Sequence, residues 1–180
     1  MKRELFQIIE IPEGIEVSID GGEIKVKGAK GENKRMFNIS NLIFEKKGKE
    51  IIIGNKKASK KEKRRMNTIA SHINNMIKGV QDKFEYKLKI CFVHFPITVE
   101  VKEHEAIIKN FLGEKTPRKS KIPAGAEVKV EKDIITIQSN DIETAGQAAA
   151  NLERATKISK RDRRIFQDGI FITNKCGEEI

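Results

Sequence analysis

Apolar and polar residues alternate along the first third of the chain, and this two-residue period predicts β-strands. Residues 5–11 are apolar-rich, and residues 15–26 alternate around a glycine-containing turn. Residues 36–39 predict another short strand, and residues 42–53 predict a second hairpin around a glycine. We therefore expect strands and hairpins as far as Gly54.

The spacing of apolar residues then changes to that of a helix. Between residues 66 and 80 they recur every three or four positions, which places them on one helical face. Ser59 followed by Glu62 has the spacing of a capping box, and Gly79 is a stop signal. The pattern predicts a helix from about Ser59 to Lys78 that buries one face on the strands.

The second half of the chain returns to alternation and then predicts one more helix. Alternating runs occur at residues 84–90, 97–101, 106–109 and 128–137. Asn140 followed by Glu143 can start the helix. Its inward face consists of small residues and one leucine, namely Ala145, Ala148, Ala149 and Leu152. Such a face predicts a close approach of the helix to a sheet.

The second half also repeats the first. Residues 15–32 (IEVSIDGGEIKVKGAKGE) match residues 97–114 (ITVEVKEHEAIIKNFLGE) at an offset of 82, so that Ile15 falls on Ile97. Residues 45–55 match residues 131–140 with one deletion, and a predicted helix follows in both cases. A repeat at this period indicates a duplicated unit.

The repeat predicts an α+β fold of two tandem similar domains, each an antiparallel sheet packed with one main helix. The expected domains are residues 1–82 and residues 83–180, with the boundary near Gly79 to Lys83.

Charge adds a class of partner to this picture. The 180 residues include 36 Lys and Arg against 26 Asp and Glu, for a net charge of +10. Such an excess favours a nucleic acid, or more weakly an anionic membrane. No apolar run is long enough to span a bilayer, and no apolar signal core follows the first residues, so a soluble cytoplasmic protein is expected.

Residues with catalytic or metal-binding chemistry form no motif. The three histidines, His72, His94 and His104, are scattered, and neither a phosphate-binding loop nor a nucleophile elbow occurs. Cys91 and Cys176 are far apart and are expected to be free thiols in a reducing compartment. We therefore expect no enzyme, no cofactor and no metal.

Three basic segments remain as candidate binding sites. Residues 56–65 (KKASKKEKRR) begin the first predicted helix and fit either a solvated helix face or a surface for a polyanion. Residues 114–121 (EKTPRKSK) predict a loop whose charges must meet water or an anion. Residues 157–164 (KISKRDRR) precede an apolar run around Asp168-Gly169, a pair typical of turns that need positive φ. This last segment indicates either a basic loop pinned by an ordered strand or a solvated loop followed by an edge strand.

Two stretches of the second half resemble a known family. NFLGEKTPRKSKIP at residues 110–123 and RDRRIFQDGIFIT at residues 161–173 are similar to the large-subunit ribosomal protein six family, in its archaeal and eukaryotic branch. KVKGAKGE at residues 25–32 resembles that family's first-domain motif. The resemblance implies two tandem domains of related fold that arose by duplication. The family pattern carries Tyr where this chain has Phe171, so one hydroxyl is missing.

The resemblance implies a structural constituent of the large ribosomal subunit, without catalysis, that binds large-subunit rRNA mainly through its second domain. The family lies near the stalk base and the sarcin-ricin loop, so neighbouring ribosomal proteins and translational GTPases are further expected partners. A free-standing RNA chaperone or regulator and an RNA-modifying or RNA-cleaving enzyme are the alternatives.

We expect the two second-domain loops to share one RNA-binding surface, because neither loop can bury its charges. The residues expected to contact RNA are Lys115, Thr116, Arg118, Lys119, Lys121, Lys157, Lys160, Arg161, Arg163, Arg164 and Lys175.

Overall fold

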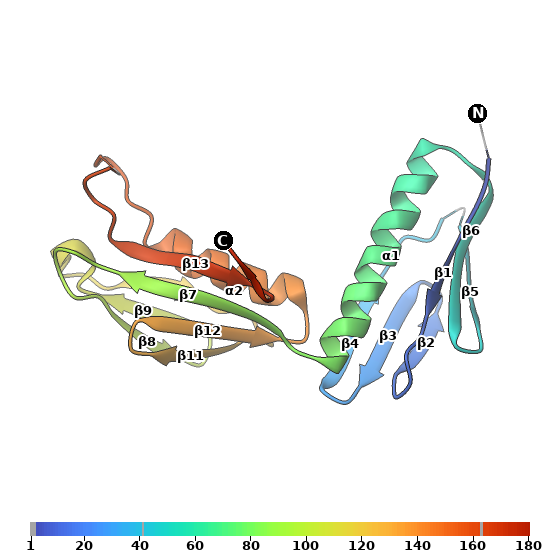
Figure 1. The fold of residues 1–180 in the computed structure, drawn as a ribbon, viewed down its shortest axis with the longest axis horizontal. Coiled ribbons are helices and arrows are strands. Elements are labelled where there is room, and N and C mark those ends of the chain that lie inside the picture. Colours follow the sequence, from blue (N-terminus) through green and yellow to red (C-terminus); the bar gives the residue numbers. More distant parts are fainter. Residues whose placement is uncertain (1–2, 41, 163) are drawn as a thin grey trace. The chain divides into compact units, whose positions relative to one another are not determined.

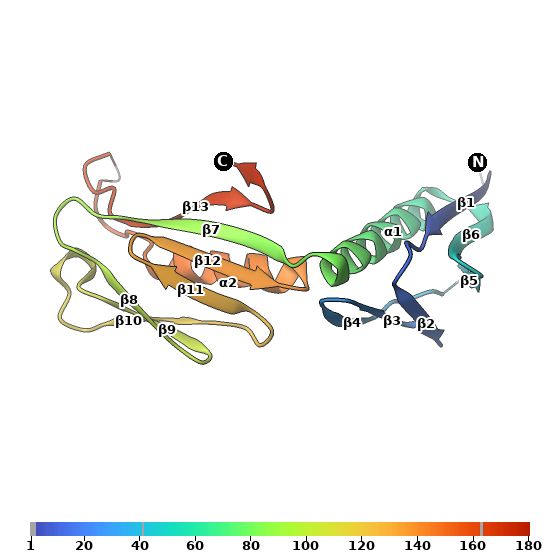
Figure 2. The same ribbon diagram turned by 60° about the horizontal axis from the view of Figure 1, so that its bottom comes forward.

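A computed structural model describes residues 3–40, 42–162 and 164–180. The chain divides into two compact units, Met1–Lys83 and Phe84–Ile180 (Figures 1 and 2). Among the described residues, no helix combines the length and the apolar character needed to cross a membrane.

The first unit consists of two three-stranded antiparallel sheets and one helix. One sheet has the order β1-β6-β5, with β1 at Arg3–Glu10, β5 at Ile43–Lys47 and β6 at Glu50–Ala58. The other has the order β2-β3-β4, with β2 at Glu16–Asp20, β3 at Glu23–Gly28 and β4 at Gly31–Met36. Helix α1, at Lys60–Gln81, packs on strands of both sheets (Figure 1).

The core of the first unit lies between α1 and the two sheets. The helix contributes large apolar side chains from one face, as its spacing predicts. β3 and β6 contribute the alternate residues of their strands. The side chains that are fully shielded from solvent are Ile24, Val26, Ile51, Ile53, Ile73 and Val80.

Helix α1 begins as predicted and ends later than predicted. Ser59 and Glu62 form the expected capping box, in which the backbone N–H of Ser59 donates to the Glu62 carboxylate at 2.9 Å. The helix continues past Gly79 to Gln81 because Val80 is buried against Gly28, where a Cβ would lie 2.8 Å from the valine side chain. Packing of the last turn therefore outweighs the stop signal.

The second unit has a five-stranded antiparallel sheet of order β11-β12-β7-β13-β14 and a three-stranded sheet of order β10-β9-β8. The larger sheet is formed by β7 (Phe84–Cys91), β11 (Glu127–Glu131), β12 (Ile134–Ser139), β13 (Gly169–Lys175) and β14 (Glu178–Glu179). The smaller sheet is formed by β8 (Thr98–Lys102), β9 (Glu105–Lys109) and β10 (Arg118–Lys121), with a 3-10 turn at Phe111–Gly113. Both cysteines are free thiols, as expected.

Helix α2, at Ile142–Ala155, packs against β7, β12 and β13 of the larger sheet and against β10 of the smaller sheet (Figure 2). Its cap is Asp141 rather than Asn140, because the Asp141 carboxylate accepts from the backbone N–H of Glu143 at 3.2 Å and from the Thr144 hydroxyl at 2.9 Å. The predicted inward face is confirmed, since all of its members are buried: Ala145, Ala148, Ala149 and Leu152.

The order of elements confirms two tandem α+β units. β1-β6-β5 of the first unit corresponds to β7-β12-β11 of the second, and β2-β3-β4 corresponds to β8-β9-β10. Ile15 and Ile97 directly precede the corresponding strands β2 and β8. The strands of each unit form two sheets rather than the single sheet expected. β13 and β14 follow the second helix and have no counterpart among the described residues of the first unit.

Candidate nucleic-acid interface

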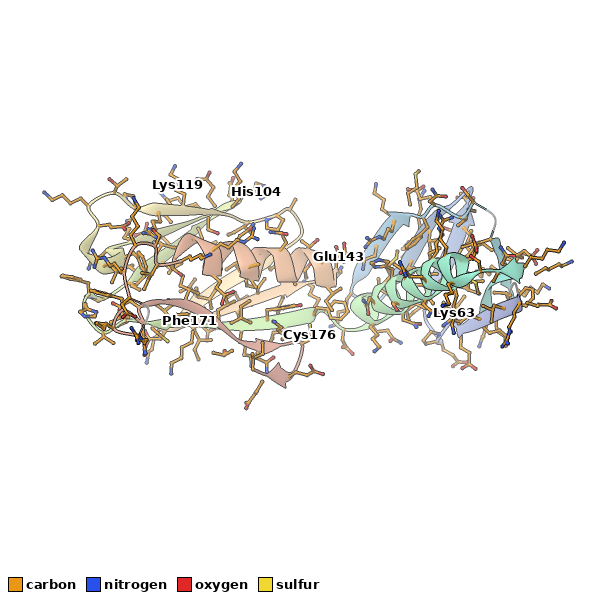
Figure 3. All side chains as sticks on the ribbon, turned by 90° about the horizontal axis from the view of Figure 1, so that it is seen from above. Lys63, His104, Lys119, Glu143, Phe171 and Cys176 are labelled. Carbon is orange, nitrogen blue, oxygen red and sulfur yellow. The ribbon has the colours of Figure 1, made fainter. Side chains whose placement is uncertain are left out.

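Strand β10 divides the cations of the first basic loop between two faces of its sheet. Ser120 is buried, and successive side chains of a strand point to opposite faces, so Arg118 shares the inward face with Ser120. Lys119 and Lys121 are exposed on the outward face, and Figure 3 shows Lys119 directed away from the ribbon. The Lys119 ammonium lies 3.6 Å from a carboxylate oxygen of Glu105. The cations of this loop therefore do not form one cluster.

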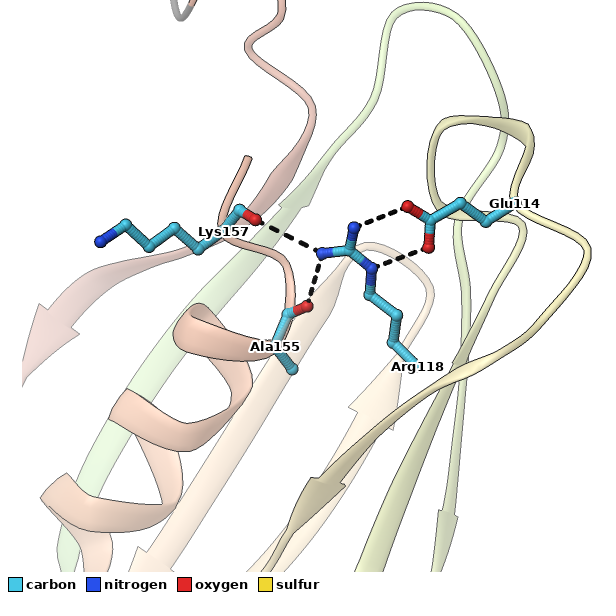
Figure 4. A network of polar contacts seen from close by, with 4 residues as sticks. All are labelled: Glu114, Arg118, Ala155 and Lys157. Atoms are coloured by element: carbon cyan, nitrogen blue, oxygen red, sulfur yellow. Dashed lines mark hydrogen bonds and ion pairs between the residues drawn. The ribbon is translucent and has the colours of Figure 1, made fainter. Parts of the chain in front are cut away.

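The guanidinium of Arg118 connects the two basic loops of the second unit (Figure 4). Its Nε and Nη2 donate to the two carboxylate oxygens of Glu114, at 2.8 and 2.6 Å. Its Nη1 donates to the backbone carbonyl oxygens of Ala155, at 2.9 Å, and of Lys157, at 3.4 Å. The guanidinium carbon also lies 4.2 Å from the centre of the Phe111 ring.

These contacts occupy most of the hydrogen-bonding capacity of Arg118. A guanidinium has five N–H donors, and paired bonds to a carboxylate are among its strongest interactions. The hydrogen bonds from Arg118 hold the pKa of Glu114 below its usual range. The carbonyl groups at the end of α2 are also favourable partners for a cation, because the helix dipole is negative there. This geometry suits a residue that positions the two loops.

The second basic loop, residues 157–168, is folded around Asp162. The Asp162 carboxylate accepts from the backbone N–H of Arg164 at 2.9 Å and from its guanidinium at 3.2 and 2.8 Å. The backbone N–H groups of Ile165 and Phe166 donate to the carbonyl oxygen of Asp162. The hydrogen bonds from Arg164 lower the pKa of Asp162. The loop is therefore a compact turn that exposes its described basic side chains.

Asp168 pins the end of this loop, but not through the turn that the Asp-Gly pair predicts. The Asp168 side chain is fully buried, and its carboxylate accepts from the backbone N–H of His94 at 3.3 Å and lies 3.2 Å from the His94 ring Nδ1. Gly169 lacks a positive φ and begins β13. A Cβ on Gly169 would lie 3.2 Å from the Phe171 ring and 3.5 Å from the Thr156 hydroxyl, so close packing explains the glycine. The prediction of a positive-φ turn is wrong, whereas the pinned loop is observed.

Two opposing effects set the pKa of Asp168. Burial raises this pKa, whereas hydrogen bonds from the His94 ring and from the backbone N–H groups of His94 and Val93 lower it, and the lowering prevails. Asp168 is therefore a buried anion at neutral pH, and it fastens the basic loop to the connection between β7 and β8.

Aromatic and basic side chains meet beside this anchor. The Phe166 ring stacks on His94 with centroids 5.3 Å apart, and the guanidinium carbon of Arg161 lies 4.8 Å from the Phe166 centroid. A hollow of about 890 Å³ opens between the end of β7, the end of α2 and the start of β13. Its lining combines rings and cations, including Phe92, Phe171, Lys89, Arg154 and Lys157.

The structure brings together part of the predicted surface. Arg118 and Lys157 are in direct contact, and the charge of Arg161 acts on Glu114. Lys115, Thr116, Lys160 and Arg164 are exposed in the same two loops. Lys119 and Lys121 lie on the opposite face of β10, and Lys175 lies at the far end of β13, six residues or about 20 Å from Gly169. Arg163 lies outside the described residues.

Sequence reasoning missed the residues that hold the loops in place. His94 had no motif around it, and Asp168 was interpreted as a turn residue. Phe166 looked like part of an apolar strand, yet it precedes β13. Their partners are distant in the chain, and no local spacing could have paired them.

The basic segment of the first unit, residues 56–65, lies on the end of β6 and the first turns of α1. Lys60, Lys61, Lys63 and Arg64 are exposed, and Figure 3 shows Lys63 on this helix. Arg65 is half-buried, and its guanidinium donates to the backbone carbonyl of Ser40 at 3.1 Å. Both interpretations of this segment, solvated face and polyanion surface, remain compatible with the exposure.

The chain matches one family model twice. The model is described as ribosomal protein L6, and it matches residues 11–83 and residues 95–169. Each match falls within one of the two structural units.

Archaeal proteins named large ribosomal subunit protein uL6 are similar to almost the whole chain. The protein of Staphylothermus marinus is 49% identical over 181 residues, which cover 97% of this chain and 96% of the relative. The protein of Methanobrevibacter smithii is 46% identical over 167 residues, which cover 93% and 94%. The protein of Ignicoccus hospitalis is 45% identical over 170 residues, which cover 92% and 91%.

Proposed function

Given that this chain belongs to the ribosomal protein L6 family, in its archaeal branch, we propose that it binds large-subunit rRNA through the two basic loops of its second unit. Membership makes the protein a structural, non-enzymatic component of the large ribosomal subunit. Its place of action is therefore the ribosome, in the cytoplasm, with rRNA and ribosomal proteins as partners.

One observation carries the proposal, namely the contact of Arg118 with both basic loops. Arg118 holds Glu114 on one side and the carbonyl groups of Ala155 and Lys157 on the other. Lys115 of the first loop and Lys157, Lys160, Arg161 and Arg164 of the second are thereby carried on two loops that are held to each other. A preorganised cationic surface binds a polyanion at a lower cost in conformational entropy than a loose one.

The shape of the RNA supplies the specificity in this proposal. Lys and Arg contacts to phosphates release counterions and provide affinity, whereas folded rRNA is recognised by its shape and by unstacked bases. The rRNA elements that we propose are those near the stalk base and the sarcin-ricin loop, with ribosomal proteins and translational GTPases of that region as further partners.

The test is the salt dependence of binding by the full chain to an rRNA fragment from the stalk-base region. Replacing Lys160, Arg161 and Arg164 by Gln should make the slope of log affinity against log salt shallower by about 2 to 3 units if each side chain meets a phosphate. The measurement is a titration at several salt concentrations.

The matched control replaces Lys60, Lys61 and Lys63 of α1 by Gln, which removes the same charge from the first unit. An equal loss of slope in both triple variants would contradict binding mainly by the second unit. Equal affinity of the wild-type chain for unrelated RNAs would instead favour the alternative of a general RNA chaperone or regulator.

A further inference from the structure

The outward face of the β1-β6-β5 sheet in the first unit has an unusual composition. The register places Gly54 of β6 between Phe6 of β1 and Ile43 of β5, and it places Ile52 opposite Ile8. The neighbours of these residues along the strands, such as Ile9, Ile51 and Ile53, are buried in the core. Because the side chains of a strand alternate between its two faces, Phe6, Ile8, Ile43 and Ile52 point outward.

Four apolar side chains thus lie together on the outside of the sheet. Phe6 is 46% exposed and Ile8 is 59% exposed, while Ile43 and Ile52 are half-buried. A Cβ on Gly54 would lie 2.0 Å from the Phe6 ring, so the ring lies across the glycine and spreads over the sheet. A contiguous apolar patch of this kind on a soluble protein usually marks an interaction site.

Carboxylates border this patch at one end. Glu10 lies directly opposite Glu50, and Glu45 lies opposite Ile52. All three glutamates are exposed. Like charges placed opposite each other destabilise a sheet, and Lys47, which lies opposite Glu50 on β5, is the lysine that offsets them here.

Nearby lysines are held by other partners. The ammonium of Lys46 donates to the carbonyl of Val17 at 2.7 Å, and that of Lys49 lies 2.9 Å from Glu13. Lys47 lies 3.8 Å from Glu45 on the outward face itself. In a chain whose net charge is +10, the face is therefore apolar at its centre and acidic at the end that carries Glu10 and Glu50, while the exposed Lys56 follows Gly54 at the other end.

The duplicated strands of the second unit provide an internal reference. The outward residues of β7, which alternate with buried Tyr86, Leu88 and Ile90, are Glu85, Lys87 and Lys89. The outward residues beside them on β12 are Ile134, Thr136 and Gln138. The same sheet position is thus mainly polar in one unit and apolar in the other.

We propose that this face, defined by Phe6, Ile8, Ile43, Ile52, Glu10, Glu45 and Glu50, docks a protein whose surface carries apolar side chains beside Lys or Arg. The glutamates oppose RNA phosphates and anionic lipids. A second copy of the chain would bring the same three carboxylates against Glu10, Glu45 and Glu50, so self-association is also opposed. Charge complementarity leaves a basic protein surface as the matching partner. The proposal does not depend on rRNA binding by the second unit.

The test places a photoreactive phenylalanine analogue at Phe6 of the full chain, in large subunits assembled in cells and isolated as translating ribosomes. Irradiation and mass spectrometry then identify the cross-linked segment. The expected product joins Phe6 to one peptide of another protein, with Lys or Arg beside apolar residues. Replacing Glu10 and Glu50 together by Gln should lower the yield several-fold.

Two controls accompany this test. Glu13→Gln removes an exposed carboxylate outside the face and should leave the yield unchanged. The same analogue at Phe171, beside the basic loop, reports separately on the proposed rRNA contact. A cross-link from Phe6 to rRNA, to another copy or to the second unit of the same chain would overturn the proposal. The proposal would also be overturned if no cross-linked protein were found, or if replacing Glu10 and Glu50 by Gln left the yield unchanged.

Discussion

The two units share one order of strands around one helix, but they differ at the strand that opens each of them. β1 is an edge strand of its sheet, whereas the corresponding β7 lies between β12 and β13. The segment that reaches β13 from α2 is the basic loop, residues 157–168. One of the two basic loops therefore belongs to a segment added after the duplicated core, whereas the other, at residues 114–121, lies within that core between β9 and the end of β10.

The helices of the two units also pack in different ways. α1 fills its interface with large side chains such as Ile69, Ile73 and Met76. α2 presents alanines instead, and a Cβ on Gly146 would lie 3.3 Å from the Tyr86 hydroxyl. The second helix therefore lies close to its sheet, which leaves little room for added volume.

The largest effect should come from breaking this close approach. Ala149→Leu places three extra carbon atoms at a fully buried position and should destabilise the second unit by about 1–3 kcal/mol. Hydrogen exchange of the backbone amides, measured separately for each unit, reports this loss. The amides of the first unit should keep their protection. Gln147→Leu, on the exposed side of the same helix, is the control. A loss of protection shared equally by both units would show that they unfold together.

A smaller effect should follow from Arg118→Lys, which keeps the charge but removes the planar group of donors. We expect a loss of about 1–2 kcal/mol in the second unit and faster hydrogen exchange in residues 157–166. RNA affinity should fall while the salt slope stays near that of the wild type, because a positioning residue makes no phosphate contact of its own.

The control for Arg118 is Lys119→Ala on the opposite face of β10, which should change stability by less than about 0.5 kcal/mol. A drop of about one unit in the salt slope of Arg118→Lys would mean that Arg118 contacts a phosphate directly.

The smallest expected effect is on the free energy of unfolding at acid pH. Asp168 has a lowered pKa in the folded state, so its contribution to stability is present above its unfolded pKa, near 3.9, and is lost as the pH falls through the folded value. One such group changes the free energy of unfolding by at most about 1.4 kcal/mol per pH unit. Urea titrations below pH 4 should therefore show this loss in the wild type and a flatter profile in Asp168→Asn.

His94→Gln should also flatten the acid profile, since it removes the ring that donates to Asp168. An acid profile of Asp168→Asn that equals the wild type would contradict the anchoring role of this carboxylate.

Periodicity and repeats were sufficient to predict both units, because each helix and most strands bury one face in a regular pattern. β4 shows the limit of this reasoning. Its residues 31–36 (GENKRM) contain a single apolar side chain, so the strand was placed at residues 36–39 instead. Phe37 follows the strand, and its backbone N–H donates to the carbonyl of Gly22. The apolar residues at positions 36–39 therefore mark the segment that packs just after β4, and not β4 itself.

In the candidate site, the sequence predicts the two basic loops but not the role of each residue within them. Charge runs identified both loops, because exposed cations are visible in any sequence. The roles within the loops depend on which face of β10 each side chain takes and on a buried contact between His94 and Asp168. These are long-range features, and they separate Arg118, which holds the loops, from Lys119 and Lys121 on the other face.

The pairing of β7 with β13 also has a consequence for biosynthesis. Leu88 pairs with Ile172, which follows it by 84 residues, whereas both sheets of the first unit are complete by residue 58. A chain made from its N-terminus can fold the first unit while the rest is still being translated. The second unit cannot complete its larger sheet until β13 has been made, so the basic loop at residues 157–168 is fixed only after the first unit can already have folded. The loop that we propose to contact rRNA is thus ordered later than the first unit.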